Sequence, residues 1–281
     1  MTETITITPA DDLQHIFDTA PENAEIRLAP GEYRQKTVIR TPGLRLTGAG
    51  MDKTRLVWDD YALKLDEQGR EYNTFRTWTM AVCADRIRME DLAVINDALH
   101  PEIKGQEVAL SVLGDDFSME NCLLSSTQDT LFAGPLPPDL IVRYAGFHAP
   151  ELLRGGHMRQ VYDRCRIEGT VDFIFGCADA LFDNCEIRSV YDARDIGYAA
   201  APAHPLEQQE GFVFRNCSFP GMRASRTAAS ISPGPGGTTG WLSLRTAATV
   251  LTSPRSVLTN GTTRPGTGQP AFVKCRRSRD G

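Results

Sequence analysis

Hydrophobic and polar residues alternate in short stretches along residues 1–221, and this pattern predicts strands. Leu44-Arg45-Leu46-Thr47 and Ile87-Arg88-Met89-Glu90 each alternate with a period of two, which is typical of a half-buried strand. Helical periodicity is confined to the neighbourhood of residues 11–19. We therefore expect an all-β fold for this part of the chain.

A weak internal repeat divides these strands into similar units. Four segments place an aromatic or apolar residue, two polar residues (often ending in Asn) and then Cys in the same order, and they end at Cys122, Cys165, Cys185 and Cys217. The interval from Cys165 to Cys185 is 20 residues. The interval from Cys122 to Cys165 is 43 residues, and it also reduces to 20 if the Pro- and Gly-rich stretch 134–156, 23 residues long, is a protruding loop. Equal units of this length are typical of a parallel β-helix, whereas an immunoglobulin-like sandwich does not require them.

Length and composition are those of an ordinary globular protein. The chain has 281 residues, of which 41% are hydrophobic and 23% are charged. Its longest apolar runs fall far short of the roughly 18 residues that suggest a membrane-spanning helix. Residues 1–7 have neither the basic nor the apolar region of a signal peptide, so we expect a cytoplasmic location for the chain as written.

Cysteine and histidine positions do not indicate a metal site. The seven cysteines form no Cys-x-x-Cys pair, which favours reduced thiols in the core over a disulfide framework or a zinc site. His148 and His157 lie in the expected loop without a carboxylate or cysteine at the spacing of a ligand set. We therefore expect no metal and no cofactor.

Two aspartates occupy equivalent places in successive repeats. Asp129 follows Cys122 by seven residues, and Asp172 follows Cys165 by seven. Because stacked strands are about 4.8 Å apart, equivalent side chains on adjacent coils nearly touch, and two carboxylates that close do not both ionise easily. Such a pair offers one carboxylate to attack and one carboxylic acid to donate a proton. The alternative is two solvated surface aspartates; the apolar run Val171–Gly176 around Asp172 favours the pair, because a buried acid is costly without a role or partner.

The same residues lie in segments that resemble the pectin methylesterases. The third of that family's ordered signature segments is highly specific, and Gly169–Gly176 (GTVDFIFG) matches it. The other matching segments are Gln106–Leu110, Gln128–Phe132, Pro30–Tyr33, Thr47–Gly50, Ala201–Pro202 and Gly211–Phe214. The resemblance covers about residues 5–221. It implies a right-handed, single-stranded parallel β-helix of the pectin lyase-like type, in agreement with the repeat.

The resemblance also implies a role for each matching residue. Asp172 would be the nucleophile that attacks the methyl-ester carbonyl of a galacturonate unit. Asp129 would protonate the departing methanol and then activate water. Gln128 would donate hydrogen bonds to the tetrahedral oxyanion, and Gln106 and Thr74 would contact the substrate.

The implied reaction is the removal of methyl esters from pectin with release of methanol. The partner would be methyl-esterified polygalacturonate or its oligosaccharides. We expect a monomer that binds neither nucleic acid nor a membrane, although members of the family are often secreted.

Two other functions stay open on the sequence alone. One is a catalytically inactive β-helix that binds acidic polysaccharide, and the other is a polygalacturonase or pectate lyase on the same fold. A polygalacturonase would need further acids and a lyase calcium ligands or a basic residue, and the sequence shows neither arrangement. Tyr72, Trp78 and Phe132 are candidates for stacking on sugar rings, with core packing as the alternative.

The last 60 residues differ in composition from the rest. Residues 222–281 contain nine Lys or Arg and a single acid, Asp280. The resemblance implies a segment like Leu-Gly-Arg-Pro-Trp after residue 221, with an arginine that holds the nucleophilic aspartate and a tryptophan that packs on the sugar. Residues 230–240 read Ser-Ile-Ser-Pro-Gly-Pro-Gly-Gly-Thr-Thr-Gly instead.

A shifted reading frame accounts for both departures. If each new codon takes the third base of one codon and the first two bases of the next, Ala224–Ala247 can encode a string that contains Arg-Pro-Trp. The same string contains Val-Phe-Glu-Asn-Cys, a further copy of the repeat at Val213–Cys217. We therefore divide the chain into a pectinesterase-like β-helix domain (1–221) and a frameshifted, poorly ordered tail (222–281) that impairs activity. A native basic, Thr-rich disordered tail is the alternative.

Overall fold

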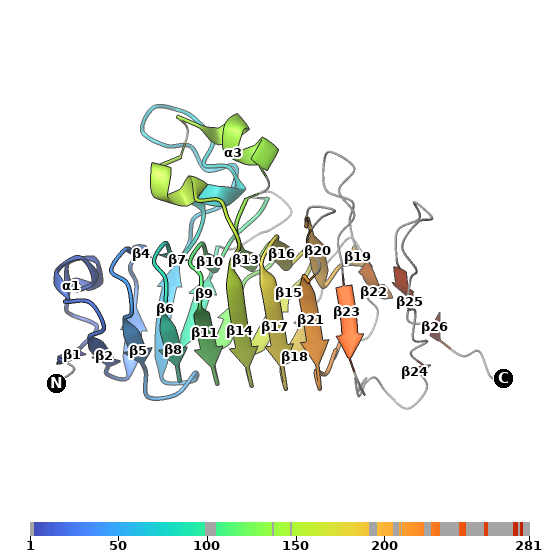
Figure 1. Ribbon diagram of the computed structural model, residues 1–281, viewed down its shortest axis with the longest axis horizontal. Coiled ribbons are helices and arrows are strands. Elements are labelled where there is room, and N and C mark those ends of the chain that lie inside the picture. Colours follow the sequence, from blue (N-terminus) through green and yellow to red (C-terminus); the bar gives the residue numbers. More distant parts are fainter. Residues whose placement is uncertain are drawn as a thin grey trace.

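The computed structural model describes the chain to residue 221 with short gaps. The described residues are 3–98, 105–136, 138–146, 148–190, 196–204, 208 and 210–221, together with the backbone of strands within residues 226–230, 242–245, 256–257, 272–274 and 276–277. Through these residues the chain winds into a parallel β-helix, with successive coils stacked along its long axis (Figure 1). The predicted all-β, parallel β-helix class is confirmed.

Three parallel sheets, here named A, B and C, form the sides of the helix. Sheet A contains β1 (Thr4–Ile7), β2 (Glu25–Leu28), β5 (Arg45–Thr47), β8 (Arg88–Glu90), β11 (Phe117–Glu120), β14 (Arg159–Asp163), β17 (Asp179–Asp183), β21 (Phe212–Arg215) and β23 (Leu242–Arg245). Sheet B contains β3 (Gly31–Tyr33), β6 (Thr54–Trp58), β9 (Ala93–Asn96), β12 (Leu123–Ser125), β15 (Arg166–Gly169) and β18 (Glu186–Ser189). Sheet C contains β4 (Thr37–Ile39), β7 (Met80–Val82), β10 (Leu110–Val112), β13 (Leu131–Ala133), β16 (Ile174–Gly176) and β20 (Ala200–Pro202).

The remaining described elements are short. The helices are α1 (Leu13–Thr19), η1 (Thr74–Arg76), α3 (Pro138–Tyr144) and η2 (Pro150–Leu153). The small strands outside the three sheets are β19 (Ile196–Gly197), β22 (Arg226–Ser230), β24 (Ser256–Val257), β25 (Phe272–Lys274) and β26 (Arg276–Arg277).

The register of sheet A reproduces the predicted repeat. Tyr162 pairs with Phe182, and Phe182 pairs with Phe214, so the cysteines three positions later lie in the same place on successive coils. Those cysteines are Cys122, Cys165, Cys185 and Cys217, each exposed by 2% or less. The six cysteines in the described part of the chain are free thiols, as expected.

The backbone conformation explains why asparagine recurs in the repeat. Asn121, Asn184 and Asn216 have φ between 50° and 54°, in the left-handed region where the chain turns from sheet A into sheet B. Asparagine tolerates this conformation better than most residues, because its short polar side chain bonds locally. The cysteine that follows then enters the core as a small apolar side chain.

Aromatic rings stack along the core beneath sheet A. The rings of Tyr162 and Phe182 are parallel, with centroids 4.8 Å apart, and those of Phe182 and Phe214 are 4.7 Å apart. These three side chains are at most 3% exposed. At the start of the chain, α1 buries Leu13 and Phe17 in the core of the β-helix.

The Pro- and Gly-rich stretch 134–156 protrudes, as predicted. It carries α3 and η2, which stand above sheet C beside the loop that contains η1 (Figure 1). Leu152 of this stretch is buried in an apolar cluster on the outer face of sheet C. The pairs Arg154–Asp85 and Arg40–Glu151, both 2.8 Å, fix its far end to earlier coils.

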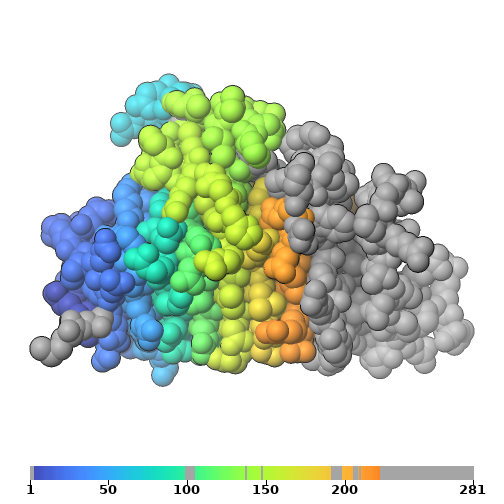
Figure 2. All heavy atoms as spheres, in the orientation of Figure 1, coloured from blue at the N-terminus to red at the C-terminus, as the bar shows by residue number. Residues whose placement is uncertain are grey.

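The space-filling view shows these two loops as a raised block above the stacked coils (Figure 2). Within the described residues, no helix is long and apolar enough to cross a membrane. The expected disorder of 222–281 concerns residues that lie largely outside the described ones. Of that segment, the backbone of β23 pairs with β21 in sheet A.

Candidate active site

The two aspartates identified from the repeat lie side by side on neighbouring coils. Leu131 of β13 pairs with Ile174 of β16, so Asp129 and Asp172, two residues earlier, occupy the same register position. The backbone N–H of Asp129 donates to the carbonyl of Val171 at 3.1 Å, which holds the two turns together. The two aspartates therefore hold equivalent backbone positions on successive coils.

Both aspartates have left-handed backbone conformations. Asp129 has φ of 64° and Asp172 has φ of 49°. Such values are uncommon outside glycine, although aspartate adopts them more readily than most residues. Both side chains are half-buried, and one carboxylate oxygen of Asp172 is completely inaccessible. The turn from sheet B to sheet C therefore presents the same acid twice, in the same backbone geometry.

Gln128, Gln106 and Thr74 reach the same edge of sheet C. Gln128 precedes Asp129, and its carbonyl accepts a hydrogen bond at 3.0 Å from the N–H of the residue after Gln106. The carbonyl of Thr74 accepts from the Thr77 hydroxyl at 2.8 Å, and Thr77 in turn accepts from the N–H of Val108 at 2.9 Å. The structure thus brings all five predicted site residues to four consecutive coils, which lead into β7, β10, β13 and β16.

Aromatic side chains cover the sheet next to the aspartates. Phe132 and Phe175 pair in register three residues after Asp129 and Asp172, and their ring centroids are 5.0 Å apart. Phe75 packs on Phe132 at 5.2 Å. This apolar wall limits access of water to that side of the site.

Two of the three aromatic residues suggested for sugar stacking pack in this wall instead. Phe132 is 3% exposed and Trp78 is 7% exposed, because the stretch 134–156 folds over both. Tyr72 is half-buried, with the Lys36 ammonium 4.9 Å and the Arg76 guanidinium 4.8 Å from its ring. Packing therefore accounts for Phe132 and Trp78.

A charged cluster forms the base of the loop that carries η1. Lys36 bonds to Asp60 at 2.5 Å, and the pKa of Lys36 is lowered because burial disfavours its charged form. Asp60 is only 2% exposed and also accepts from Lys64. Burial raises the pKa of Asp60, but the attraction and hydrogen bonds of the two lysines outweigh it and leave the pKa below its usual value. This cluster fixes the loop and keeps its charges paired.

His148 lies over the aromatic wall. It is 6% exposed and packs edge-on against Tyr144 at 5.1 Å and Phe75 at 6.1 Å. Burial, with a smaller contribution from Arg76, lowers the pKa of His148 to about 4. The ring is therefore neutral near pH 7 and acts there as a packing group.

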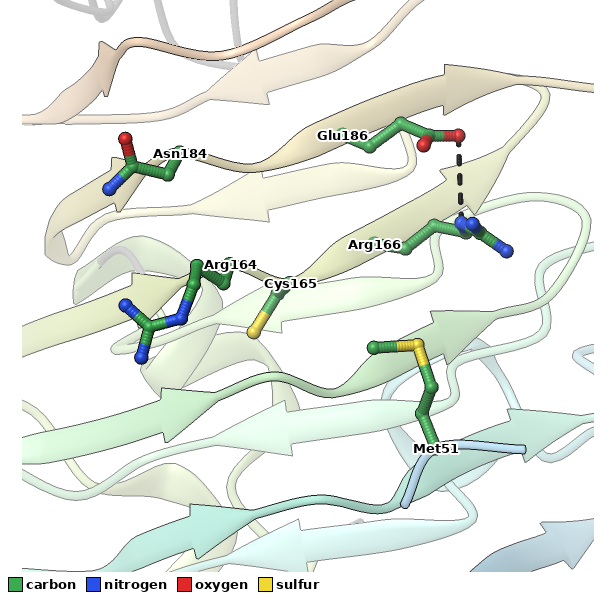
Figure 3. Close-up of a pocket in the computed structure, with 6 residues that line it drawn as sticks. All are labelled: Met51, Arg164, Cys165, Arg166, Asn184 and Glu186. Atoms are coloured by element: carbon green, nitrogen blue, oxygen red, sulfur yellow. Dashed lines mark ion pairs between the residues drawn. The ribbon is translucent and has the colours of Figure 1, made fainter. Parts of the chain in front are cut away.

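The described residues contain no cluster of three or more His, Cys, Asp or Glu side chains that could hold a metal ion. A separate shallow hollow lies at the turn from sheet A to sheet B, lined by Met51, Arg164, Cys165, Arg166, Asn184 and Glu186 (Figure 3). Arg166 is paired with Glu186 there at 3.5 Å. The hollow lies on a different turn of the coils from the one that carries the two aspartates.

One buried acid near the site was not predicted from the sequence. Glu107 is 0% exposed and lies one coil before Asp129. The sequence does contain a signal for Glu107, because this acid directly precedes the apolar run Val108-Ala109-Leu110. An acid next to an apolar run also drew attention to Asp172.

The sequence is similar to a known protein family. The family model described as Pectinesterase matches residues 3–135 and 151–233. The chain belongs to the pectinesterase family. The gap between the matched segments falls within the protruding stretch 134–156, so the match follows the coils of the β-helix.

Curated pectinesterases match at moderate identity. Pectinesterase QRT1 of Arabidopsis thaliana is 28% identical over 78% of this chain and 53% of its own length. Pectinesterase 31 of the same plant is 30% identical over 70% of this chain and 55% of its own length. The chain thus spans about half the length of these relatives.

Solved structures confirm the fold. A pectin methylesterase crystallised with a hexasaccharide has a TM-score of 0.71 and 22% identity, covering 87% of this chain and 78% of that one. The pectin methylesterase of Erwinia chrysanthemi gives a TM-score of 0.71 and 21% identity over 98% and 86%. At these identities the similarity establishes the parallel β-helix and nothing finer.

Proposed function

We propose that this chain hydrolyses the methyl esters of galacturonate units in pectin, with Asp172 as nucleophile and Asp129 as acid and base. The observation that carries the proposal is the register match of Asp129 and Asp172 on adjacent coils of a pectinesterase-family β-helix. Like charges this close favour a state in which one carboxyl is ionised and the other protonated. That state is the one the reaction needs.

In the first half of the reaction a carboxylate oxygen of Asp172 adds to the ester carbonyl. The carbonyl electrons move to its oxygen, and the Gln128 amide donates a hydrogen bond to this oxyanion. When the carbonyl re-forms, the bond to the methoxy oxygen breaks, and Asp129 gives its proton to the leaving group. Methanol departs, and the galacturonyl group remains joined to Asp172 as an anhydride.

In the second half water takes the place of methanol. Asp129, now ionised, accepts a proton from water while the water oxygen adds to the galacturonyl carbonyl. Collapse of this intermediate breaks the bond to Asp172 and releases the galacturonate unit as its carboxylic acid, which then loses its proton to solvent. Asp129 is protonated again, so both aspartates return to their starting states without a metal or cofactor.

Gln106 and Thr74 are proposed to orient the sugar. Both are half-buried and precede neighbouring strands of sheet C, on the two coils before the one that carries Asp129. A polysaccharide that runs along the stacked coils would meet them in turn. We propose methyl-esterified polygalacturonate or its oligosaccharides as the substrate of a monomeric enzyme.

We further propose that residues from about 222 onward are translated in a shifted frame. In the offset frame, Val-Phe-Glu-Asn-Cys spans codons 242 to 247. The structure pairs Val213 of β21 with Ser243 of β23, where that copy of the repeat would begin. This agreement supports the shift. The shift would remove the Arg-Pro-Trp segment that the family resemblance implies, so activity of the chain as written would be low.

The missing arginine also keeps the second candidate function in view, a β-helix that binds acidic polysaccharide without cleaving its ester. Methanol release from highly methylated pectin separates the two. The esterase produces methanol and new carboxyl groups in equal amounts, without new reducing ends or unsaturated products. Binding of pectin without methanol, in the frame-restored chain as well, would favour the second candidate.

A further inference from the structure

Glu107 contacts the catalytic turn through both its backbone and its side chain. Its N–H donates to the carbonyl of Gln128 at 3.0 Å, and its carboxylate accepts a hydrogen bond from the Thr127 hydroxyl. The residue is 0% exposed, and glutamate is almost never buried to that extent unless it is paired. None of the steps proposed above uses it.

The hydrogen bonds continue from Thr127 to the turn that carries Asp172. The backbone N–H and the hydroxyl of Thr170 both donate to the carbonyl of Thr127, at 2.5 and 2.9 Å. Thr127 and Thr170 each lie two residues before one of the aspartates. Glu107 therefore stands at one end of a polar ladder that joins both aspartate turns.

We propose that Glu107 is a positioning residue for Asp129. It holds the turn 127–129 through the Thr127 hydroxyl, and its negative charge favours the protonated form of Asp129. The inference rests on the proposed function only for the role of Asp129 as the acid. Its physical basis is that a buried negative charge one coil away makes a second one harder to form.

Other charged or titratable groups lie on the described coils and loops next to the turn of Asp129. They are Asp172 on the next coil, Tyr198 on the coil beyond, and Arg76 and His148 on the two loops that pack on Phe132. Asp172 acts in the same direction as Glu107, whereas the positive charge of Arg76 favours the ionised form of Asp129. A substitution confined to Glu107 leaves these contributions in place. A difference in the titration of Asp129 between that variant and the parent therefore measures the effect of Glu107 alone.

The test is a carboxyl titration by carbon-13 NMR on the full chain. The signal of Asp129 is assigned by its loss in Asp129→Asn. In Glu107→Gln, which keeps the shape and an acceptor oxygen, the higher pKa of the aspartate pair should fall by about one unit. Glu168→Gln is the matched control, because the Glu168 carboxylate accepts a hydrogen bond from the Ser125 hydroxyl on the neighbouring coil at 2.9 Å but lies in sheet B. The control should leave the aspartate titration unchanged.

A second pair of variants tests the anchoring of the turn. Thr127→Val removes the hydroxyl that donates to Glu107, whereas Thr127→Ser keeps it. Hydrogen exchange of the Asp129 and Thr170 amides should become about tenfold faster in Thr127→Val and stay near wild type in Thr127→Ser. This measurement decides the matter even if Glu107→Gln does not fold.

An unchanged aspartate titration in folded Glu107→Gln, or equal exchange in both Thr127 variants, overturns the inference. Neither readout requires turnover. A frame-restored chain that releases no methanol but shows these shifts would therefore count against the proposed function alone.

Discussion

Asp129 and Asp172 repeat one another, because each lies two residues before a strand of sheet C at the same register position and each has a left-handed backbone. The β-helix generates this relationship by stacking equivalent turns about 4.8 Å apart. We expect two carboxyl groups this close to lose their protons in two separate steps. The predictions for activity below refer to the chain in its restored reading frame, unless stated otherwise.

Asp129→Asn should lower the rate of methanol release by a factor of about 100 to 10,000, the usual contribution of a general acid or base. The parent protein should show an acid limb in its pH profile, set by ionisation of the pair to its singly charged form. Its upper limb should reflect loss of the second proton. Initial rates of methanol release across about pH 4 to 9 provide the measurement, and a flat profile would contradict a paired-carboxylate mechanism.

Gln128→Leu should reduce kcat by a factor of about 100 to 1,000, because the oxyanion loses a neutral hydrogen-bond donor that matters most in the transition state. KM should change much less. Val161→Ala, at a residue 40% exposed on β14, is a suitable control for kcat. A Gln128 variant with normal kcat would show that another group stabilises the oxyanion.

Phe182→Ala should lower the free energy of unfolding by about 4 kcal/mol. Phe182 is 0% exposed and is stacked between Tyr162 and Phe214, so truncation leaves a cavity between coils. Urea unfolding monitored by circular dichroism gives the value. Val161→Ala should change it by no more than about 0.5 kcal/mol, as expected of an exposed position. A loss below about 1 kcal/mol for Phe182→Ala would mean that the aromatic stack is not a major part of the core.

His148 should make stability fall as the pH is lowered. Burial lowers the pKa of its ring from the ordinary 6.5 to about 4, so the unfolded chain binds a proton first. The neutral His148 ring contributes fully to the free energy of unfolding above about pH 6.5. This contribution is lost as the pH falls to about 4, which lowers the free energy of unfolding by about 3 kcal/mol. Unfolding free energies of His148→Phe should show less of this pH dependence than the parent.

His15→Asn is the control for that measurement, because His15 is an exposed histidine on α1. It should retain the pH dependence of the parent. Identical pH profiles for His148→Phe and the parent would place His148 in a more solvated environment than the structure does.

Restoring the reading frame near codon 221 should raise both methanol release and soluble yield. The restored segment would supply Arg-Pro-Trp and a further coil, and the end of a stack of repeats needs a covering element for solubility. Limited proteolysis of the chain as written should cleave within residues 222–281. If the chain as written is as active and as protease-resistant as the restored one, the tail is native.

Much of the fold follows from sequence because the coils are stacked in register. Cysteine spacing locates equivalent inward positions, and the asparagine before Cys122, Cys185 and Cys217 marks a left-handed turn, which Arg164 adopts before Cys165. The same turn recurs one coil earlier, where Asp91 has φ of 56° and Leu92 takes the place of the cysteine with 0% exposure. The repeat was harder to detect there because Leu is common, whereas Cys is rare.

Long-range packing explains what the sequence did not show. Burial of Trp78 and Phe132 depends on the stretch 134–156, which leaves the coil directly after β13 and packs back on the outer face of sheet C. Proline and glycine predict that stretch 134–156 is a loop, but they carry no information on the surface it covers. The burial of Glu107 likewise depends on Thr127, which is 20 residues later in the chain. Local patterns locate the aspartates, whereas the surroundings of the aspartates require the assembled coils.

The most direct test of the central claim is methanol release by Asp172→Asn beside its parent. The substitution removes the attacking oxygen's charge while keeping the shape of the side chain, so the fold and the binding of pectin oligosaccharides should persist. The parent should release methanol from methyl-esterified pectin, and folded Asp172→Asn should release none above background. Methanol release at a comparable rate by folded Asp172→Asn would show that Asp172 is not the nucleophile.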